Sequence, residues 1–320
     1  MNTASPLRIL IMGAGSLGSV VGGFMAQAGH RVTLAGRPVH MNAIREKGLT
    51  ITGIWGDHHT TDLDVNTDLD GLNEKSFDLV VLSVKSYDTQ DTIESIAPLV
   101  DENTLICSYQ NGLGNAEIIA EAFGWDRCVE ARVIFGAWIP EPGTVDVTVM
   151  AHKTALGVYR DTPHLERIKE IAIAMDEAGV PTEFSNNIGT VLWYKLAYNC
   201  ALNPLSALLD VTYGALLDTD NTRQIMVDVI RELYAVGHAK DITLDPPDAE
   251  RYIDVFMNQL VPSTGGHYAS TREDIRNGKR TEIDALNGAI CRFGEELGVP
   301  TPVNDLLTRL IRAKEHTYLA

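Results

Sequence analysis

The fold is decided by the apolar run Leu7–Met12 (LRILIM) and the glycine-rich run Gly13–Gly18 (GAGSLG) directly after it. A continuous apolar run is typical of a strand buried in a parallel sheet. The pattern G-x-G-x-x-G between such a strand and a helix is typical of the dinucleotide-binding turn of a Rossmann domain. There Gly13 allows the tight turn, Gly15 lets the backbone approach a pyrophosphate, and Gly18 lets the helix pack closely. The expected cofactor-binding residues of this turn are Gly13, Ala14, Gly15, Ser16, Leu17 and Gly18. The alternative is a glycine-rich turn without a ligand.

The rest of the first half alternates short apolar runs with helix-length periodic segments. We expect helices near Ser16–Ala28 and Val39–Lys47, and strands at Arg31–Gly36, Phe77–Val84, Thr104–Ser108, Val129–Ile139 and Thr154–Tyr159. This alternation predicts an α/β Rossmann domain with a doubly wound, mainly parallel sheet. The β-rich excursion Leu49–Val65 fits no regular strand–helix unit.

After about residue 185 the pattern becomes helical, with hardly a convincing strand. Pro, Asn and Gly cluster in Ala178–Gly189, as is typical of a boundary. The sequence therefore predicts a cofactor domain over residues 1–186 and an all-α C-terminal substrate domain over residues 187–320.

Composition narrows the class of protein. The formal net charge of −17 argues against nucleic acid and anionic membranes as partners. The four cysteines lie far apart without a C-x-x-C pattern, so we expect reduced thiols and no metal site. The start, Met1–Pro6, is uncharged and the following apolar run is too short for a signal or a span. We expect a cytoplasmic protein.

Residues after three strands indicate which cofactor binds. The second strand ends in Leu34–Arg37 (LAGR) without the carboxylate that an NAD site uses for the ribose hydroxyl. The guanidinium of Arg37 suits a 2′-phosphate. Lys85 comes directly after the strand Phe77–Val84 and could reach the same side of the cofactor, so NADPH is favoured over NADH. Asn111 lies in a loop after the strand Thr104–Ser108, where it could bind the cofactor ribose or the substrate. Solvated loop positions for Arg37 and Lys85, and an ordinary Asn-Gly turn, are the alternatives.

Catalytic candidates lie in the second half. Lys195, Asn199 and Asn203 are spaced four apart, so on a helix they share one face of a mostly apolar segment. Pro204 disfavours helical geometry at Asn203 and is expected to aim that side chain out of the helix end. A substrate with a carboxylate and a carbonyl would satisfy this polar face, whereas the alternative is a ridge bonded to neighbouring loops.

A second polar cluster covers residues 270–284 (STREDIRNGKRTEID). Within it Glu282 precedes an apolar-patterned helix, expected at Ala285–Leu297. The position suits a carboxylate that points inward, although a glutamate at a helix start is commonly a first-turn charge.

Several of these stretches together resemble the ketopantoate reductase (2-dehydropantoate 2-reductase) family, in order and over nearly the whole chain. They are GAGSLG, SVKSYDT (83–89), QNGLG (110–114), WYKLAYNCALNPLSAL (193–208) and GKRTEIDALNG (278–288). The resemblance implies a Rossmann domain joined to an all-helical domain, with the active site in the cleft between. It implies Lys195 as general acid and Glu282 as the partner that binds a substrate hydroxyl. It further implies that Asn111, Asn199, Asn203 and Ser270 hold the substrate and that Arg37 and Lys85 meet the 2′-phosphate.

The family commonly shows Ser-Ser-Met where this chain has Ala269-Ser270-Thr271, which leaves the pocket wall, and so the substrate, open. The leading hypothesis is NADPH-dependent reduction of ketopantoate to (R)-pantoate, on the path to pantothenate and coenzyme A. The alternatives are a reductase of another 2-oxo acid and a non-catalytic NADP(H)-binding sensor. The sequence leaves the oligomeric state open, with a homodimer as one form.

Overall fold

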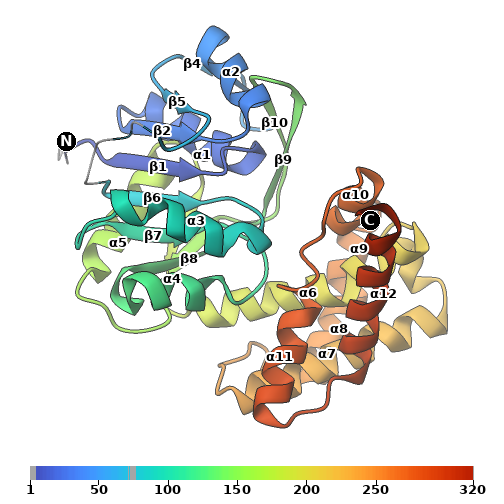
Figure 1. The fold of residues 1–320 in the computed structure, drawn as a ribbon. Helices are drawn as coiled ribbons and strands as arrows, with labels where there is room; N and C mark the ends of the chain where they lie inside the picture. Colours follow the sequence, from blue (N-terminus) through green and yellow to red (C-terminus); the bar gives the residue numbers. More distant parts are fainter. Residues whose placement is uncertain (1–4, 71, 73–76, 320) are drawn as a thin grey trace. The chain divides into compact units, whose positions relative to one another are not determined.

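The computed structural model describes residues 5–70, 72 and 77–319, and contacts divide them into two compact units (Figure 1). The first, which we call the sheet unit, comprises the chain up to Gln110 together with Asn115–Ile188. The second, the helical unit, comprises Asn111–Gly114 and the chain from Gly189 onward. The expected Rossmann fold followed by a helical region is confirmed. The short segment Asn111–Gly114 packs with the helical unit, although the sheet unit flanks it on both sides in the chain.

The sheet unit is built on one long sheet. Its strand order is β12-β11-β8-β7-β6-β1-β2-β5. The strands are β1 Arg8–Met12, β2 Arg31–Ala35, β5 Asp64–Asn66, β6 Leu79–Leu82, β7 Leu105–Ser108, β8 Cys128–Arg132, β11 Thr154–Gly157 and β12 Thr182–Ser185. All neighbouring strands run parallel except β8 and β11. Because the chain goes from β1 outward to β2 and later returns to β6, the strand order reverses between β1 and β6. Such a switch point, at the carboxyl ends of the strands, is where open α/β sheets bind ligands.

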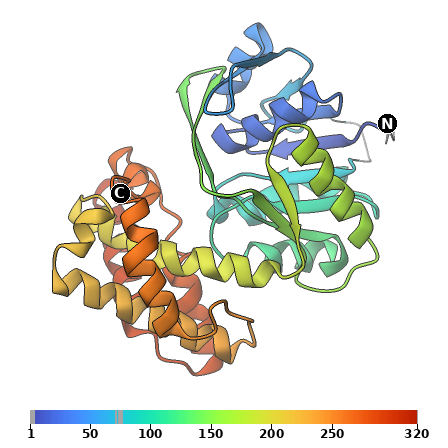
Figure 2. The ribbon, with the colours of Figure 1, turned by 180° about the vertical axis from the view of Figure 1, so that it is seen from behind.

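Helices cover both faces of this sheet. They are α1 Ser16–Gln27, α2 Pro38–Lys47, α3 Thr89–Ile96, α4 Asn115–Phe123 and α5 Leu165–Glu177, with short turns η1 Ser86–Asp88, η2 Ala97–Leu99 and η3 Trp125–Arg127. In β1, Ile9 and Ile11 belong to the apolar cluster that includes residues of α1 and α5. Leu10, between them, belongs to the cluster with residues of α3 and α4. Alternate side chains of one buried strand therefore supply the cores of both faces, and Figure 2 shows α5 (yellow-green) on one of them.

The first two strands of the excursion after α2 belong to a second sheet of order β4-β3-β10-β9, whereas its last strand, β5, is an edge strand of the first sheet. Its strands are β3 Leu49–Gly53, β4 His58–Thr60, β9 Phe135–Glu141 and β10 Thr144–Met150. The single strand expected at Val129–Ile139 is therefore wrong, because β8 and β9 are separate strands in different sheets. The strands β10 and β12 were not expected.

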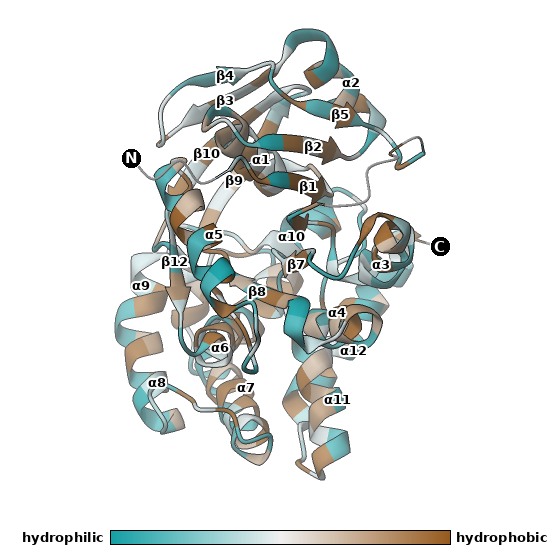
Figure 3. Cartoon of the chain, turned by 90° about the vertical axis from the view of Figure 1, so that its left-hand side faces the viewer, coloured by the Kyte–Doolittle hydropathy of each residue, from teal (hydrophilic) through white to brown (hydrophobic). Residues whose placement is uncertain are grey.

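The helical unit contains α6 Ile188–Leu209, η4 Gly214–Leu217, α7 Asp220–Ala239, α8 Ala249–Val255, η5 Phe256–Leu260, α9 Val261–Ser263, α10 Ser270–Arg276, α11 Asn287–Leu297 and α12 Pro302–Leu319. Trp193 of α6 is fully buried and stacks on Phe293 of α11, with ring centroids 6.4 Å apart. The brown and teal bands along α7 and α11 in Figure 3 show the alternation of apolar and polar residues that lets helices share a core. No helix in the described part of the chain is long and apolar enough to cross a membrane.

Helix α6 continues through Pro204, so the expected break at Asn203 is wrong. Proline lacks the N–H that would bond the carbonyl of Cys200 four residues earlier. That carbonyl instead accepts a hydrogen bond of 3.1 Å from the amide nitrogen of Asn287. Asn287 is fully buried and also donates to Asn304 at 3.0 Å. A side chain far along the sequence thus compensates for the proline and keeps Asn203 within the helix.

Candidate active site

The glycine turn after β1 is held against the neighbouring strands. Gly13 has a φ of +81°, and a Cβ there would lie 2.6 Å from the backbone nitrogen of Val84. The N–H groups of Gly13 and Ala14 donate to the carbonyl of Ala35, at 3.0 and 2.9 Å. Only glycine fits at residue 13, because the turn lies directly on the loop that follows β6.

The helix start beside this turn has room for an anion. A Cβ on Gly18 would lie 2.9 Å from the Gly13 oxygen, so α1 packs closely on the turn. A Cβ on Gly15 would meet only that oxygen, at 3.8 Å, which leaves open space outside residue 15. The N–H groups in the first turn of α1, which begins at Ser16, have no partners within the helix. Open space beside such donors fits a pyrophosphate.

Two basic residues follow the strands on either side of β1. Arg37 comes two residues after β2 and is exposed, and no described residue makes a hydrogen bond or ion pair with its guanidinium. Lys85 comes three residues after β6, is half-buried and precedes η1. The segment Ala35-Gly36-Arg37, at the end of β2, has no carboxylate side chain. The chemistry of these residues fits a phosphate on the adenosine ribose better than a free ribose hydroxyl.

A cavity of about 170 Å³ lies within the helical unit. Its lining includes every catalytic and substrate-binding residue expected from the sequence, namely Asn111, Lys195, Asn199, Asn203, Ser270 and Glu282. Tyr213, Thr271, Asp274 and Leu286 complete the lining. One amine, three amides and two carboxylates thus surround a space suited to a small polar ligand.

The amine of Lys195 is held by the loop after β7. Its Nζ donates a hydrogen bond of 2.7 Å to Oδ1 of Asn111. The loop is fixed beside it, because the Leu113 N–H donates to the Ala285 carbonyl at 2.8 Å. Gly112, with φ +85°, lies so close to Ala285 that a Cβ would be 2.4 Å from its oxygen. The backbone at residues 112 and 113 therefore sets the position of Asn111.

At the other end of the polar face of α6, Asn203 is buried and its Oδ1 accepts a hydrogen bond of 2.8 Å from the hydroxyl of Tyr213. Burial raises the pKa of Tyr213 above its ordinary value, with Tyr198 as a lesser cause. The hydroxyl therefore stays protonated and available as a donor.

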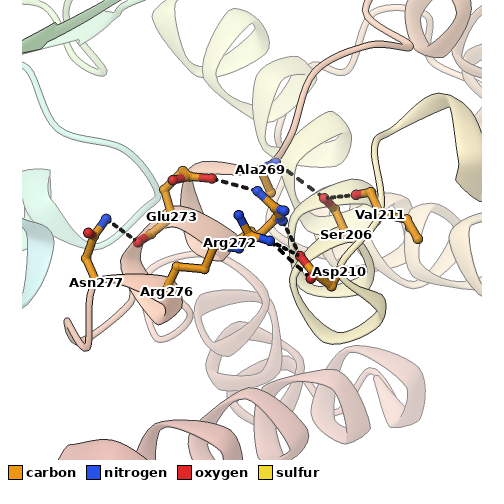
Figure 4. Close-up of polar contacts among 8 residues, drawn as sticks. All are labelled: Ser206, Asp210, Val211, Ala269, Arg272, Glu273, Arg276 and Asn277. Carbon is orange, nitrogen blue, oxygen red and sulfur yellow. Dashed lines mark hydrogen bonds and ion pairs between the residues drawn. The ribbon is translucent and has the colours of Figure 1, made fainter.

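Figure 4 shows how α10 is tied to the end of α6. Arg272, whose side chain is only 7% exposed, pairs with Asp210 at 2.5 Å and with Glu273 at 2.8 Å. Arg276 also pairs with Asp210, at 3.2 Å. The hydroxyl of Ser206 in α6 accepts from the Ala269 N–H at 3.3 Å. We call this set the α6–α10 clasp; it holds the helix start that brings Ser270, Thr271 and Asp274 to the cavity.

Glu282 lies in a turn before α11, not in its first helical turn. Its backbone carbonyl accepts from the N–H groups of Ala285 and Leu286, and its side chain is buried at the cavity. The expected helix at Ala285–Leu297 begins two residues later, at Asn287. Ser270 is exposed although it lines the cavity, so it lies at the rim.

Sequence reasoning missed three lining residues, Asp274, Tyr213 and Leu286, whereas it had named Thr271 at the pocket wall. Asp274 lies four residues after Ser270 in α10, so helical spacing could have found it. Tyr213 lies in an irregular loop and Leu286 in a turn, and neither carries a sequence pattern. Among the described residues, no group of three or more His, Cys, Asp or Glu side chains could hold a metal ion.

Comparison with known families gives two matches along the chain. Residues 9–161 match the family described as "Ketopantoate reductase PanE/ApbA". Residues 187–315 match "Ketopantoate reductase PanE/ApbA C terminal".

Similar proteins match over almost their whole length. The 2-dehydropantoate 2-reductase of Aquifex aeolicus is 37% identical over 97% of this chain and 97% of its own. That of Pyrococcus horikoshii is 36% identical, over 97% and 98%. The crystal structure of a PanE/ApbA family ketopantoate reductase from Ralstonia eutropha has a TM-score of 0.87 at 33% identity and covers 98% of this chain and 100% of its own. A D-mandelate dehydrogenase with NADH and anilino(oxo)acetate has the same TM-score at 28% identity, over 98% and 100%.

Proposed function

This chain belongs to the ketopantoate reductase family, oxidoreductases that act on a CH–OH group, and we propose that it reduces 2-dehydropantoate (ketopantoate) to (R)-pantoate with NADPH. The product is a precursor of pantothenate and coenzyme A. Two similar proteins that carry the name of this activity match almost end to end with this chain, which supports the choice of substrate.

The observation that carries the proposal is the cavity of the helical unit. It brings Lys195, held by Asn111, into one space with Asn199, Asn203 and Glu282. A 2-oxo acid needs a cation and amide donors for its carboxylate and carbonyl, and a hydroxyl on its chain needs an acceptor. The lining supplies each of these groups.

A nicotinamide cofactor held at the glycine turn would supply the hydride for the carbonyl carbon. The residues of the chain handle the charge that then develops on the carbonyl oxygen. Lys195 in its ammonium form stabilises this charge and transfers a proton to the oxygen, which completes the CH–OH group. Asn111 accepts from the same Nζ at 2.7 Å and so orients the amine. Glu282 binds the substrate hydroxyl, and Asn199, Asn203 and Ser270 also hold the substrate.

We assign the cofactor site of the sheet unit to Gly13–Gly18, Arg37 and Lys85. The open space outside Gly15 and the start of α1 fit the pyrophosphate. Arg37 and Lys85 would hold the adenosine 2′-phosphate, which favours NADPH over the NADH seen with D-mandelate dehydrogenase. On the same grounds we propose residues 1–186 as the cofactor domain and residues 187–320 as the substrate domain.

A second candidate is the reduction of a different 2-oxo acid by the same residues. The similarity to D-mandelate dehydrogenase in complex with anilino(oxo)acetate favours it, because that protein binds an oxo acid of another shape on the same fold. A non-catalytic NADP(H) sensor is the third hypothesis, and it gives no reason for a lysine held in a polar cavity.

We further propose that the protein is cytoplasmic, in line with its four free cysteines. A homodimer stays a prediction, and light scattering at several protein concentrations tests it.

The proposal is tested by following NADPH oxidation at 340 nm with ketopantoate, a panel of other 2-oxo acids, and NADH in place of NADPH. We expect a kcat/KM of about 10⁴ M⁻¹s⁻¹ or more with ketopantoate and NADPH. Turnover only with another acid would support the second candidate. No turnover in the panel, together with tight NADPH binding, would leave the sensor.

The role of Lys195 is tested with Lys195→Ala. Because general acids contribute roughly 10²- to 10⁴-fold, kcat should fall by that factor while NADPH binding is kept. Lys314→Ala is the matched control, since Lys314 is an exposed lysine of α12 outside the cavity.

A further inference from the structure

Tyr213 is a cavity residue to which the proposed reaction gives no task. It lies in the loop between α6 and η4 and is 7% exposed. Two backbone hydrogen bonds fix the loop: Tyr213 N–H donates to the His267 carbonyl and Gly214 N–H to the Gly265 carbonyl, both at 2.9 Å. Gly214 and Gly265 pack so closely that a Cβ on Gly214 would lie 3.0 Å from the Gly265 oxygen. The backbone at Tyr213 is therefore fixed beside the cavity.

The hydroxyl of Tyr213 sets the orientation of the Asn203 side-chain amide. A buried phenol proton needs an acceptor, and Oδ1 of Asn203, 2.8 Å away, provides it. If the amide were turned over, its nitrogen would face this proton and could not accept it. The tyrosine thus holds Oδ1 toward itself, which leaves the amide nitrogen, with its two donors, for another partner. Because Asn203 lines the cavity, a ligand there is within reach of these donors.

The place of this donor along α6 shows which part of the substrate it meets. Asn203 lies eight residues after Lys195, about 12 Å along the helix. Both residues line the same cavity, so if Lys195 marks the carbonyl that is reduced, Asn203 meets a part of the substrate away from that carbonyl. Asp274 and Glu282 line the same cavity and disfavour a second carboxylate on the ligand. A hydroxyl suits both, because it accepts from the amide and donates to a carboxylate.

We propose that Tyr213 is a positioning residue that makes the enzyme selective for 2-oxo acids with a hydroxyl remote from the carbonyl, by fixing the amide of Asn203 as a donor. This inference rests on the proposed function. It assigns to Tyr213 an effect on substrate selection and none on the chemical step, since Lys195 lies at the other end of the polar face.

The test uses two acids that differ by one hydroxyl, ketopantoate and 3,3-dimethyl-2-oxobutanoate. Tyr213→Phe keeps the ring and removes the donor that orients Asn203. We expect the ratio of kcat/KM for the two acids to fall by roughly tenfold, through a higher KM for ketopantoate, with kcat within about twofold of the unmodified protein.

Tyr252→Phe is the matched control. Tyr252 is also fully buried, and its hydroxyl donates to the Tyr194 carbonyl at 2.9 Å, but it does not line the cavity. This variant should keep the ratio of the unmodified protein. A Tyr213→Phe variant that keeps the ratio, or that loses activity equally with both acids, would overturn the proposal.

A second variant covers the case in which Tyr213→Phe does not fold. Asn203→Asp still accepts from Tyr213 but offers the ligand an acceptor in place of a donor. The substrate hydroxyl has one proton, which goes to Glu282, so the ratio should fall in the same way. An unchanged ratio there also overturns the proposal. If the unmodified protein turns over neither acid, the proposed function fails, and the ratio of their dissociation constants, measured by calorimetry with NADPH present, tests Tyr213 in the same variants.

Discussion

Replacing Gly112 by alanine tests whether the loop after β7 sets the position of Asn111. Gly112 has a φ of +85°, and an added Cβ would lie 2.4 Å from the oxygen and 2.6 Å from the Cβ of Ala285. Ordinary contacts begin at 3.4 Å, so the methyl group cannot be accommodated without moving the loop or the turn before α11. Because the nearest atom belongs to the backbone, no rotation of a side chain relieves the contact.

The expected cost has two parts. The left-handed backbone of an alanine costs roughly 1–2 kcal/mol. The overlap with Ala285 adds about 1–3 kcal/mol, the usual range for overpacking. Gly298 is a matched control in the same unit: its φ is +68°, and a Cβ there would meet nothing within 4 Å. Gly298→Ala should therefore lose only the first part of this stability, the cost of the left-handed backbone.

Urea unfolding followed by circular dichroism gives the free energy of unfolding, and NADPH oxidation gives the activity of each variant. We expect Gly112→Ala to be the less stable of the two variants. We also expect its folded form to be less active than the unmodified protein, because Asn111 moves away from the amine of Lys195. Gly298→Ala should keep the activity of the unmodified protein. Equal stability and equal activity of the two variants would show that the close packing of Gly112 on Ala285 does not set the position of Asn111.

Three other predictions follow from single contacts. Burial raises the pKa of Glu130, with Glu117 adding to the shift, so the folded protein keeps a proton that the unfolded chain releases, and stability falls as pH rises above the ordinary carboxyl range. Glu130→Gln should thus gain stability relative to the unmodified protein between pH 5 and pH 8, measured by urea unfolding at each pH. Asp210→Asn weakens the α6–α10 clasp through Arg272 and should raise the KM of the 2-oxo acid, with kcat within about twofold. Arg37→Ala should raise the KM for NADPH by on the order of tenfold or more and leave that for NADH unchanged, in steady-state kinetics.

Each of these has an outcome that contradicts it. A stability difference between Glu130→Gln and the unmodified protein that is the same at both pH values would show that the Glu130 carboxyl is ionised to the same extent in the folded protein and in the unfolded chain, so that its pKa is not raised. An unchanged KM in Asp210→Asn would mean that the clasp does not act on the cavity. An equal change in the KM values for NADPH and NADH in Arg37→Ala would show that Arg37 does not bind the 2′-phosphate.

The first part of the fold was predictable because its signals are local. The apolar run of β1, the glycine turn and the start of α1 are contiguous, and the second strand follows at once. The residues of β10 (TVDVTVM) also alternate, yet they pair with β3, whose residues lie far earlier in the chain. Such pairing, and the separation of β8 from β9, depends on contacts that a local pattern does not contain.

The candidate site was predictable where helical spacing carries it. Lys195, Asn199 and Asn203 share a face of α6, and the structure places all three at one cavity. The effect of Pro204 was predicted wrongly, because the carbonyl it leaves without an N–H is satisfied by Asn287. Tyr213 was missed for a similar reason: its place at the cavity comes from backbone pairing with residues 265–267, and no pattern in the sequence reports this.

The proposed hydride transfer from NADPH to the carbonyl carbon of a 2-oxo acid is tested most directly with a labelled cofactor. Ketopantoate is incubated with the protein and NADPH that carries deuterium at the transferable position, and the product is examined by mass spectrometry and NMR. We expect pantoate with one deuterium at C2, and Lys195→Ala should form it far more slowly. Pantoate without deuterium, or no product while NADPH binds tightly, would contradict it.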